Sequence, residues 1–216
     1  MSEIAAPGAM TTLDPAEQNP QDIYKLLVGS VVPRPIAFVA SMDSEGVRNL
    51  APFSFFTVAS ANPPIVCFCP MMRGAAKNGL QPTKDTLRNI IATREFVVNI
   101  VSEEFAAQMN ACSADLSPEV DEFLVSGLTP VASDLIRPPR VAESHVQMEC
   151  RLQQVVHVST EPLGGSLVLG EVLRFHVSTS LLDNFRIDPD TLHAIGRMAG
   201  STYTRTRDRF DMERPK

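Results

Sequence analysis

The chain has 216 residues, of which 44% are hydrophobic and 20% are charged, a composition typical of an ordinary globular protein. A formal net charge of −6 and a pI of about 5.2 would repel a nucleic-acid backbone, and no block of Lys and Arg offsets that charge. Because no segment resembles a signal peptide or reaches the roughly 18 apolar residues of a membrane span, we expect a cytoplasmic protein with neither membrane nor nucleic-acid partners.

Composition along the chain predicts three parts. Residues 1–20 are rich in Ala, Pro and small polar residues without any period, so we expect a flexible arm laid across a partner subunit. Residues 21–205 have the length of one domain around one hydrophobic core, and residues 206–216 form a charged tail.

The first elements in chain order are short strands. Residues 22–31 indicate a short helix or turn, and the prolines at 33 and 35 then favour an extended backbone. Residues 36–56 are typical of a β-hairpin whose return strand covers 47–56. Residues 65–70 are apolar throughout, which predicts a buried third strand.

The clearest helix follows at residues 82–94. Leu87, Ile90 and Ile91 have the i, i+3, i+4 spacing of one helix face, and Thr83 is a candidate N-cap. This helix is the only segment of the first half in which the hydrophobic period changes clearly from that of a strand.

The second half of the chain returns to strands. Residues 96–101 predict a strand, residues 102–112 have helical composition, and three further strands are expected at 146–158, 166–178 and 200–205. Strands without βαβ alternation favour a mainly β fold, an antiparallel barrel with peripheral helices. The sequence contains neither GxGxxG nor GxxxxGKS, so dinucleotide-binding and P-loop folds have no support.

Some features carry weaker functional hypotheses. Residues 113–140 contain four prolines and no strong period, so we interpret them as a functional loop or a lid. Cys67 and Cys69 would share one strand face, but small buried thiols explain them better than a metal or redox pair. We predict no metal site and assign no catalytic residue, although His193 is the best placed of four dispersed histidines.

Three segments have the chemistry of a binding site. Lys84-Asp85-Thr86 opens the predicted helix, where free N–H groups, a lysine and a hydroxyl suit a phosphate, although an ordinary helix cap gives the same pattern. Residues 49–56 combine an amide, a hydroxyl and aromatics with Pro52, which indicates an edge strand or bulge. Residues 196–203 join glycines to an arginine that can hold an anion.

Together these segments resemble the flavin reductase-like proteins that bind FMN in a split barrel, the group that contains flavoredoxin. The resemblance extends from about Tyr24 to Tyr203. Its landmarks are RPIA at 34–37, NLAPFSFF at 49–56, KDT at 84–86, LTP at 128–130, PPRVAE at 138–143, GEV at 170–172 and GRM at 196–198. The family usually has Gly-Gly where this chain has Ala199-Gly200.

The resemblance implies an antiparallel split β-barrel that forms a homodimer, with FMN bound noncovalently near the subunit interface. It also implies that nine residues contact FMN: Asn49, Ala51, Ser54 and Phe55 at the ring or ribityl chain, Lys84, Asp85 and Thr86 at the phosphate, and Arg197 and Tyr203 from the C-terminal segment.

The implied activity is that of an FMN-binding oxidoreductase. NADH or NADPH would reduce the flavin, and electrons would pass to a downstream acceptor or a monooxygenase partner. Two alternatives stay open: a flavoredoxin-like electron carrier reduced by a partner protein, and an FMN-binding module without catalytic activity. The flavin supplies the redox chemistry in all such proteins, so no catalytic side chain is required.

Overall fold

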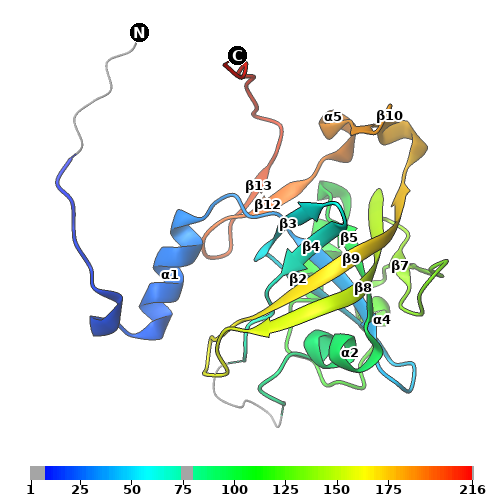
Figure 1. The fold of residues 1–216 in the computed structure, drawn as a ribbon, viewed down its shortest axis with the longest axis horizontal. Helices are drawn as coiled ribbons and strands as arrows, with labels where there is room; N and C mark the ends of the chain where they lie inside the picture. The colour runs from blue at the N-terminus through cyan, green and yellow to red at the C-terminus, as the bar shows by residue number, and fades with distance from the viewer. Residues whose placement is uncertain (1–7, 74–79, 216) are drawn as a thin grey trace.

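The protein is described by a computed structural model that covers residues 8–73 and 80–215. A curved sheet forms its body, and an N-terminal helix stands away from that body (Figure 1). Part of the predicted arm, residues 1–7, lies outside the described residues. Residues 8–14 are exposed and without regular structure, and a short 3-10 helix follows at Pro15–Glu17.

Helix α1 (Pro20–Ser30) confirms the element predicted at 22–31 and begins two residues earlier. Asn19 caps it, because its side-chain oxygen accepts from the N–H of Asp22 at 3.0 Å, and Pro20 occupies the first helical position. Only Val28 of this helix is buried. Leu26, Leu27 and the following Val31 remain 45–60% exposed, so α1 presents apolar side chains that no element of the described residues covers.

The main sheet has seven antiparallel strands in the order β2-β1-β5-β8-β9-β4-β3. Their bounds are β1 Ala37–Met42, β2 Arg48–Phe53, β3 Phe56–Ala61, β4 Pro64–Phe68, β5 Glu95–Ile100, β8 Val146–His157 and β9 Ser166–Val177. The two edge strands, β2 and β3, are joined by Ser54 and Phe55 alone. Two residues span less than about 10 Å, so the sheet must curl until its edges meet, which makes a barrel open along one seam.

The predicted return strand at 47–56 was therefore wrong in extent. The chain leaves β2 after Phe53, bends at Ser54 and Phe55, and starts the opposite edge at Phe56. The expectation that Pro52 marks an edge strand is confirmed. The N–H of Leu50, two residues earlier, points away from β1 and donates to Glu122, so the ring nitrogen of Pro52 costs the sheet no hydrogen bond.

Helix α2 (Asp85–Thr93) corresponds to the helix predicted at 82–94. Thr83 is not its N-cap. Lys84 occupies that position and its side chain caps nothing, while the carbonyl of Thr83 accepts from Arg73 and Arg88. These arginines hold residue 83 outside the helix, so the helix starts at the second residue of the Lys84-Asp85-Thr86 segment.

The remaining elements are short. They are the 3-10 helices Glu103–Phe105 and Thr179–Leu181, the helices α3 Ala106–Ala111, α4 Glu122–Ser126 and α5 Pro189–Leu192, and the strands β6 Pro130–Val131, β7 Arg140–Val141, β10 Leu182–Asp183, β11 Arg186–Ile187, β12 Ile195–Arg197 and β13 Tyr203–Arg205. Residues 113–140 are thus not a plain loop, because α4 packs against β2. The strand predicted at 200–205 begins only at Tyr203, since Gly200 turns the chain with φ of 59°.

Strand β1 is buried on both faces and separates two hydrophobic clusters. Phe38 lies on one face with Phe105 and Phe123, beneath α3 and α4. Val39 lies on the other face, in the cluster that contains Phe68 and Phe96 together with side chains of α2. Within the described residues, none of the helices is both long enough and apolar enough to cross a membrane.

Candidate functional site

Three adjoining hollows form one cleft along the outer edge of β2. Pro52 lines all three, and the central hollow has a volume of about 320 Å³. All nine residues predicted to bind the cofactor line this cleft. Sequence segments more than 100 residues apart therefore meet at the seam of the barrel, although their contacts with a cofactor stay a prediction.

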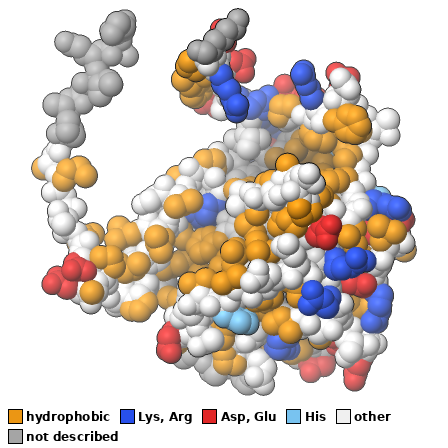
Figure 2. All heavy atoms as spheres, viewed as in Figure 1, with side chains coloured by type: hydrophobic (Ala, Val, Ile, Leu, Met, Phe, Trp, Pro, Cys, Tyr) orange, Lys and Arg blue, Asp and Glu red, His pale blue; other side chains and the backbone are white. Residues whose placement is uncertain are grey.

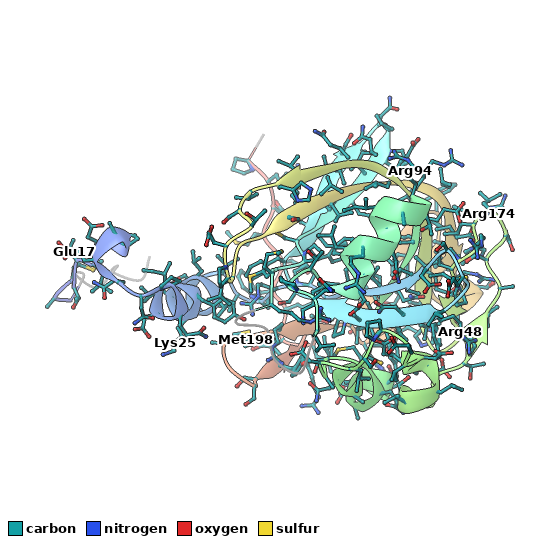
Figure 3. The ribbon with its side chains drawn as sticks, turned by 90° about the horizontal axis from the view of Figure 1, so that it is seen from below. Glu17, Lys25, Arg48, Arg94, Arg174 and Met198 are labelled. Atoms are coloured by element: carbon teal, nitrogen blue, oxygen red, sulfur yellow. The ribbon has the colours of Figure 1, made fainter. Side chains whose placement is uncertain are left out.

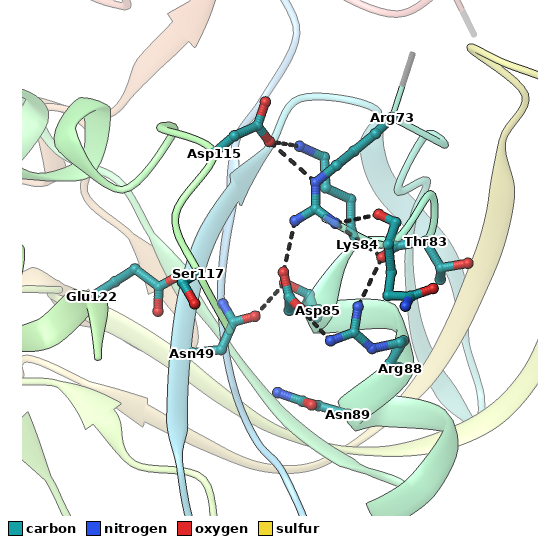
Figure 4. A network of polar contacts seen from close by, with 12 residues as sticks. Asn49, Arg73, Thr83, Lys84, Asp85, Arg88, Asn89, Asp115, Ser117 and Glu122 are labelled. Atoms are coloured by element: carbon teal, nitrogen blue, oxygen red, sulfur yellow. Dashed lines mark hydrogen bonds and ion pairs between the residues drawn. The ribbon is translucent and has the colours of Figure 1, made fainter. Parts of the chain in front are cut away.

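One end of the cleft is lined by β2 and by the start of α2, and it is rich in charge (Figure 4). Arg73 donates to Asp85 at 2.6 Å and to Asp115 at 3.2 Å. Lys84 pairs with Asp115 at 2.9 Å, and Arg88 pairs with Asp85. Arg73, Lys84 and Arg88 outnumber Asp85 and Asp115 by one positive charge, at the N-terminal end of a helix, which favours anions. Arg88 does not itself line the hollows, and Glu122, which does, adds no charge while it is protonated.

Buried polar side chains complete this end of the cleft. The hydroxyl of Thr86 donates to the side-chain oxygen of Asn49 at 3.3 Å, and both residues are buried. Lys84 holds the pKa of Asp115 below its usual value through its hydrogen bond and charge. Asp115 thus stays ionised and occupies the cations that an incoming anion would use.

Aromatic side chains line the central hollow and the third hollow, away from the start of α2. Tyr24 and Phe55 line the central hollow, and Tyr203 lines the third hollow together with Arg197. The Arg197 guanidinium lies 4.4 Å from the centre of the Tyr203 ring, and the Tyr203 hydroxyl donates to Asn110 at 3.2 Å. These flat, partly polar surfaces are suited to a heteroaromatic ring.

Sequence reasoning missed several residues of the cleft. Arg73 follows strand β4 without any local motif, and Asp115 and Glu122 come from the segment interpreted as a loop. Arg34 was recognised only as a landmark, but its guanidinium donates to the Ser54 hydroxyl at 3.3 Å. The one available signal was charge: each is an ionisable residue next to an apolar or aromatic stretch.

Glu122 is an unusual acid in this cleft. Burial raises its pKa to about 7, and the neighbouring carboxylates of Asp85 and Asp121 act in the same direction. The N–H of Leu50 donates to its carboxyl group at 3.0 Å and opposes the shift only in part. Glu122 therefore holds a proton in the folded protein at a pH where an exposed glutamate has lost it.

This proton gives a prediction for stability. Between about pH 4.5 and 7 the folded state binds a proton that the unfolded state has released, so the contribution of Glu122 is largest below this range and is lost as pH rises through it. The free energy of unfolding of the wild type therefore declines over this pH range, and we expect the decline to be about 1–2 kcal/mol smaller in Glu122→Gln. Glutamine does not titrate, and it keeps an acceptor for the N–H of Leu50. Urea unfolding of both proteins at both ends of this range tests it; parallel pH profiles would contradict it.

The best-placed histidine and the one cluster of acids with a histidine among the described residues have structural partners. His193 pairs with Glu104 at 2.6 Å and does not line any of the three hollows. Asp134, Glu149 and His176 come within 4.8 Å of one another, but the Glu149 carboxylate accepts from the N–H groups of Asp134 and Leu135 and from His176. Cys67 and Cys69 are free thiols on one side of the sheet, and burial raises the pKa of both.

The strand order, the closure at Ser54–Phe55 and the cleft define the class: an antiparallel split-barrel protein with a site for a molecule that is anionic at one end and aromatic at the other. The sequence model of the "Flavin reductase like domain" matches residues 28–200. The chain belongs to the flavin reductase-like family, and is thus a flavoprotein oxidoreductase by family.

Solved structures agree with this assignment. Nitrilotriacetate monooxygenase component B from Bacillus cereus is 38% identical with a TM-score of 0.88, covering 95% of this chain and 100% of that one. The 2-nitrobenzoate 2-nitroreductase NbaA of Pseudomonas fluorescens is 32% identical with a TM-score of 0.82, covering 95% and 96%. A protein of Shewanella frigidimarina assigned as a flavin reductase with a split barrel domain is 19% identical, and its TM-score of 0.79 over 93% of this chain and 96% of its own supports the fold.

Proposed function

We propose that the chain binds FMN noncovalently in the cleft beside β2 and that NADH or NADPH reduces this flavin. The observation that carries the proposal is the division of the cleft into an end with surplus positive charge and an aromatic end. FMN has the same division, since its phosphate bears nearly two negative charges and its ring is flat and heteroaromatic.

Each end of the cleft then has a defined role. Lys84, Thr86 and Arg73 would hold the phosphate, in place of the bonds that Lys84 and Arg73 now make to Asp115. The aromatic end with Ser54 and Phe55 would hold the ring, which leaves the open side of the central hollow for the reductant. When bound, the flavin supplies the acceptor for a hydride from the nicotinamide, so the protein needs to provide position and electrostatics rather than a catalytic acid.

The acceptor downstream is proposed from relatives. The component B of Bacillus cereus is named as part of a monooxygenase, which supports delivery of reduced flavin or electrons to a monooxygenase partner. The nitroreductase of Pseudomonas fluorescens supports a second candidate function, direct reduction of a nitroaromatic compound at the same site.

Anaerobic mixing tests the proposal. The purified protein with FMN is mixed with NADH or with NADPH, and the visible flavin band is followed with and without a nitroaromatic acceptor. Rapid bleaching by one nucleotide supports a reductase and identifies its donor, and fast return of the band with the nitro compound supports the second candidate. Bound FMN that neither nucleotide reduces would favour an electron carrier or a binding module, and absence of FMN binding would refute the site.

We also propose that the chain forms a homodimer through α1. This helix stands off the barrel (Figure 3), and hydrophobic side chains gather between the two (Figure 2). Leu27 is 55% exposed and lines the apolar hollows beside β3 and β4. An uncovered apolar surface of this kind is typical of an interface between subunits.

Leu27→Asp is therefore expected to convert the dimer to a monomer, because a charge would be buried in the apolar contact. Gln21→Asp places the same charge on the exposed first turn of α1, where it suits the helix dipole and leaves the dimer intact. Mass measurement by light scattering distinguishes the outcomes. If the Leu27→Asp variant stayed dimeric, the interface would have to lie elsewhere on the protein.

A further inference from the structure

Arg34 is a buried cation at the seam of the barrel. Its side chain is 5% exposed, and its guanidinium donates to the carbonyl oxygens of Val28 at 2.6 Å, Val31 at 2.8 Å and Met198 at 2.9 Å. It thereby ties the end of α1 to the C-terminal segment. No carboxylate lies within ion-pair distance of it in residues 8–73 and 80–215.

Such a charge is unusual, because a buried ion is costly unless an opposite charge pairs with it. Arg73, a largely buried arginine that lines the cleft, has two carboxylate partners. The carbonyl groups around Arg34 satisfy its N–H donors but leave its unit charge uncancelled. The positive potential of this charge therefore extends to whatever lies beside it.

The aromatic end of the cleft, where Ser54 and Phe55 would hold the flavin ring, lies beside Arg34; we call it the ring end, and the end with Lys84 the phosphate end. The Nε of Arg34 donates to the Ser54 hydroxyl, and the guanidinium lies 6.0 Å from the centre of the Phe55 ring. Because the Ser54 oxygen accepts from Arg34, its own proton is free to point elsewhere, and Ser54 lines the central and third hollows. With its oxygen held by Arg34, the Ser54 hydroxyl can donate to a ligand in the cleft.

A second guanidinium strengthens this field. Arg34 and Arg197 exchange two backbone hydrogen bonds of 3.0 and 2.8 Å, which bring the C-terminal segment next to β1. The Arg197 side chain likewise has no carboxylate partner within the described ranges. Asp85 and Asp115 pair with the cations of the phosphate end and leave it one surplus positive charge, whereas Arg34 and Arg197 at the ring end have no carboxylate partner within the described residues.

We propose that Arg34, acting through the Ser54 hydroxyl, makes the ring end of the cleft bind reduced, negatively charged flavin more tightly than neutral oxidised flavin. This rests on the proposed binding of FMN. Hydride transfer moves two electrons and one proton from the nicotinamide, which leaves as its oxidised cation, to the neutral ring, which gains one negative charge. Arg34 is a positioning residue that favours this product.

The test compares the affinities of the protein for oxidised and reduced FMN, measured anaerobically by titration. Arg34→Gln is expected to weaken binding of reduced relative to oxidised FMN at least about tenfold, as one lost charge shifts a neighbouring acid by about 1 pKa unit or more. For a two-electron couple, this tenfold change lowers the potential by about 30 mV. Arg34→Lys keeps the charge, so its ratio of the affinities for reduced and oxidised FMN is expected to lie close to that of the wild type.

Arg94→Gln is the matched control. Arg94 lies at the C-terminal end of α2 (Figure 3) and also donates to a carbonyl, that of Leu152. Unlike Ser54, the partner of Arg34, Leu152 does not line any of the three hollows, and neither does Arg94. This variant is expected to keep the wild-type ratio. An equal loss of both affinities in Arg34→Gln would overturn the proposal and leave Arg34 a purely structural role.

A second measurement needs no variant. In the wild-type protein, the pH at which reduction changes from taking up two protons to one is expected to lie below that of free FMN, because the anionic product is stabilised. A transition at the same pH as in free FMN, or above it, would overturn the proposal. Failure of the wild-type protein to bind FMN would instead refute the proposed function together with this inference.

Discussion

Replacing Lys84 by Met is expected to weaken FMN binding about 10- to 100-fold, because a charge-assisted hydrogen bond contributes about 1.5–3 kcal/mol. Methionine keeps the length and apolar stem of the side chain but removes its charge. Riboflavin has the same ring without the phosphate, so its affinity is expected to stay unchanged. Titration of the protein with each ligand, followed by flavin fluorescence, measures both affinities.

The control for this substitution is Lys25→Met on α1. Lys25 is exposed, pairs with Asp22 at 2.8 Å, and projects from the helix that stands apart from the barrel (Figure 3). It is expected to leave both affinities unchanged. If Lys84→Met weakened riboflavin as much as FMN, Lys84 would act on the ring or on folding, and the phosphate would have to bind elsewhere.

Replacing Gly170 by Ala is expected to lower the free energy of unfolding by about 3 kcal/mol, the upper end of the usual cost of overpacking a core. Gly170 lies in β9, and a Cβ added there would lie 2.2 Å from the ring of Phe96. That ring is fully buried against Phe68, so it has no free space into which to move. Urea unfolding of both proteins gives the difference directly.

Two further proteins isolate the cause. Gly29→Ala in α1 adds the same methyl group with nothing within 4 Å, and is expected to raise stability by about 0.5–1 kcal/mol through helix propensity. In a Phe96→Leu background, Gly170→Ala is expected to cost less than in the wild type. An undiminished cost there would show that the backbone of β9, rather than the Phe96 ring, excludes the side chain.

Local patterns in the sequence predicted a mainly β fold with one clear helix, and the family resemblance added the split barrel and the candidate site. Leu87 and Ile90 have helical spacing and are buried where helix α2 packs, and the apolar run at 65–70 is the buried β4. The nine residues taken from the family resemblance meet in one cleft. Their roles stay predictions, as do the three-part division of the chain and the cytoplasmic location.

What could not be predicted depends on contacts between distant segments. Thr83 is a residue type favoured at N-caps, but Arg73 and Arg88 both donate to its carbonyl group, and the helix starts after it. Arg73 shows no local sign of its role, because Asp85 and Asp115 reach it only in the folded chain. The pKa of Glu122 likewise depends on its burial against β2, which periodicity does not indicate.

The two-residue connection between β2 and β3 has a consequence for how this protein can diverge. Ser54 and Phe55 close the sheet on itself and at the same time line the cleft, so the width of the binding site is tied to the circumference of the barrel. An insertion at this point would separate the two sheet edges and, with them, the residues on either side of the cleft. New specificities are therefore expected to evolve from the segments that border the cleft without closing the sheet: the loop before α4 and the turn between β12 and β13.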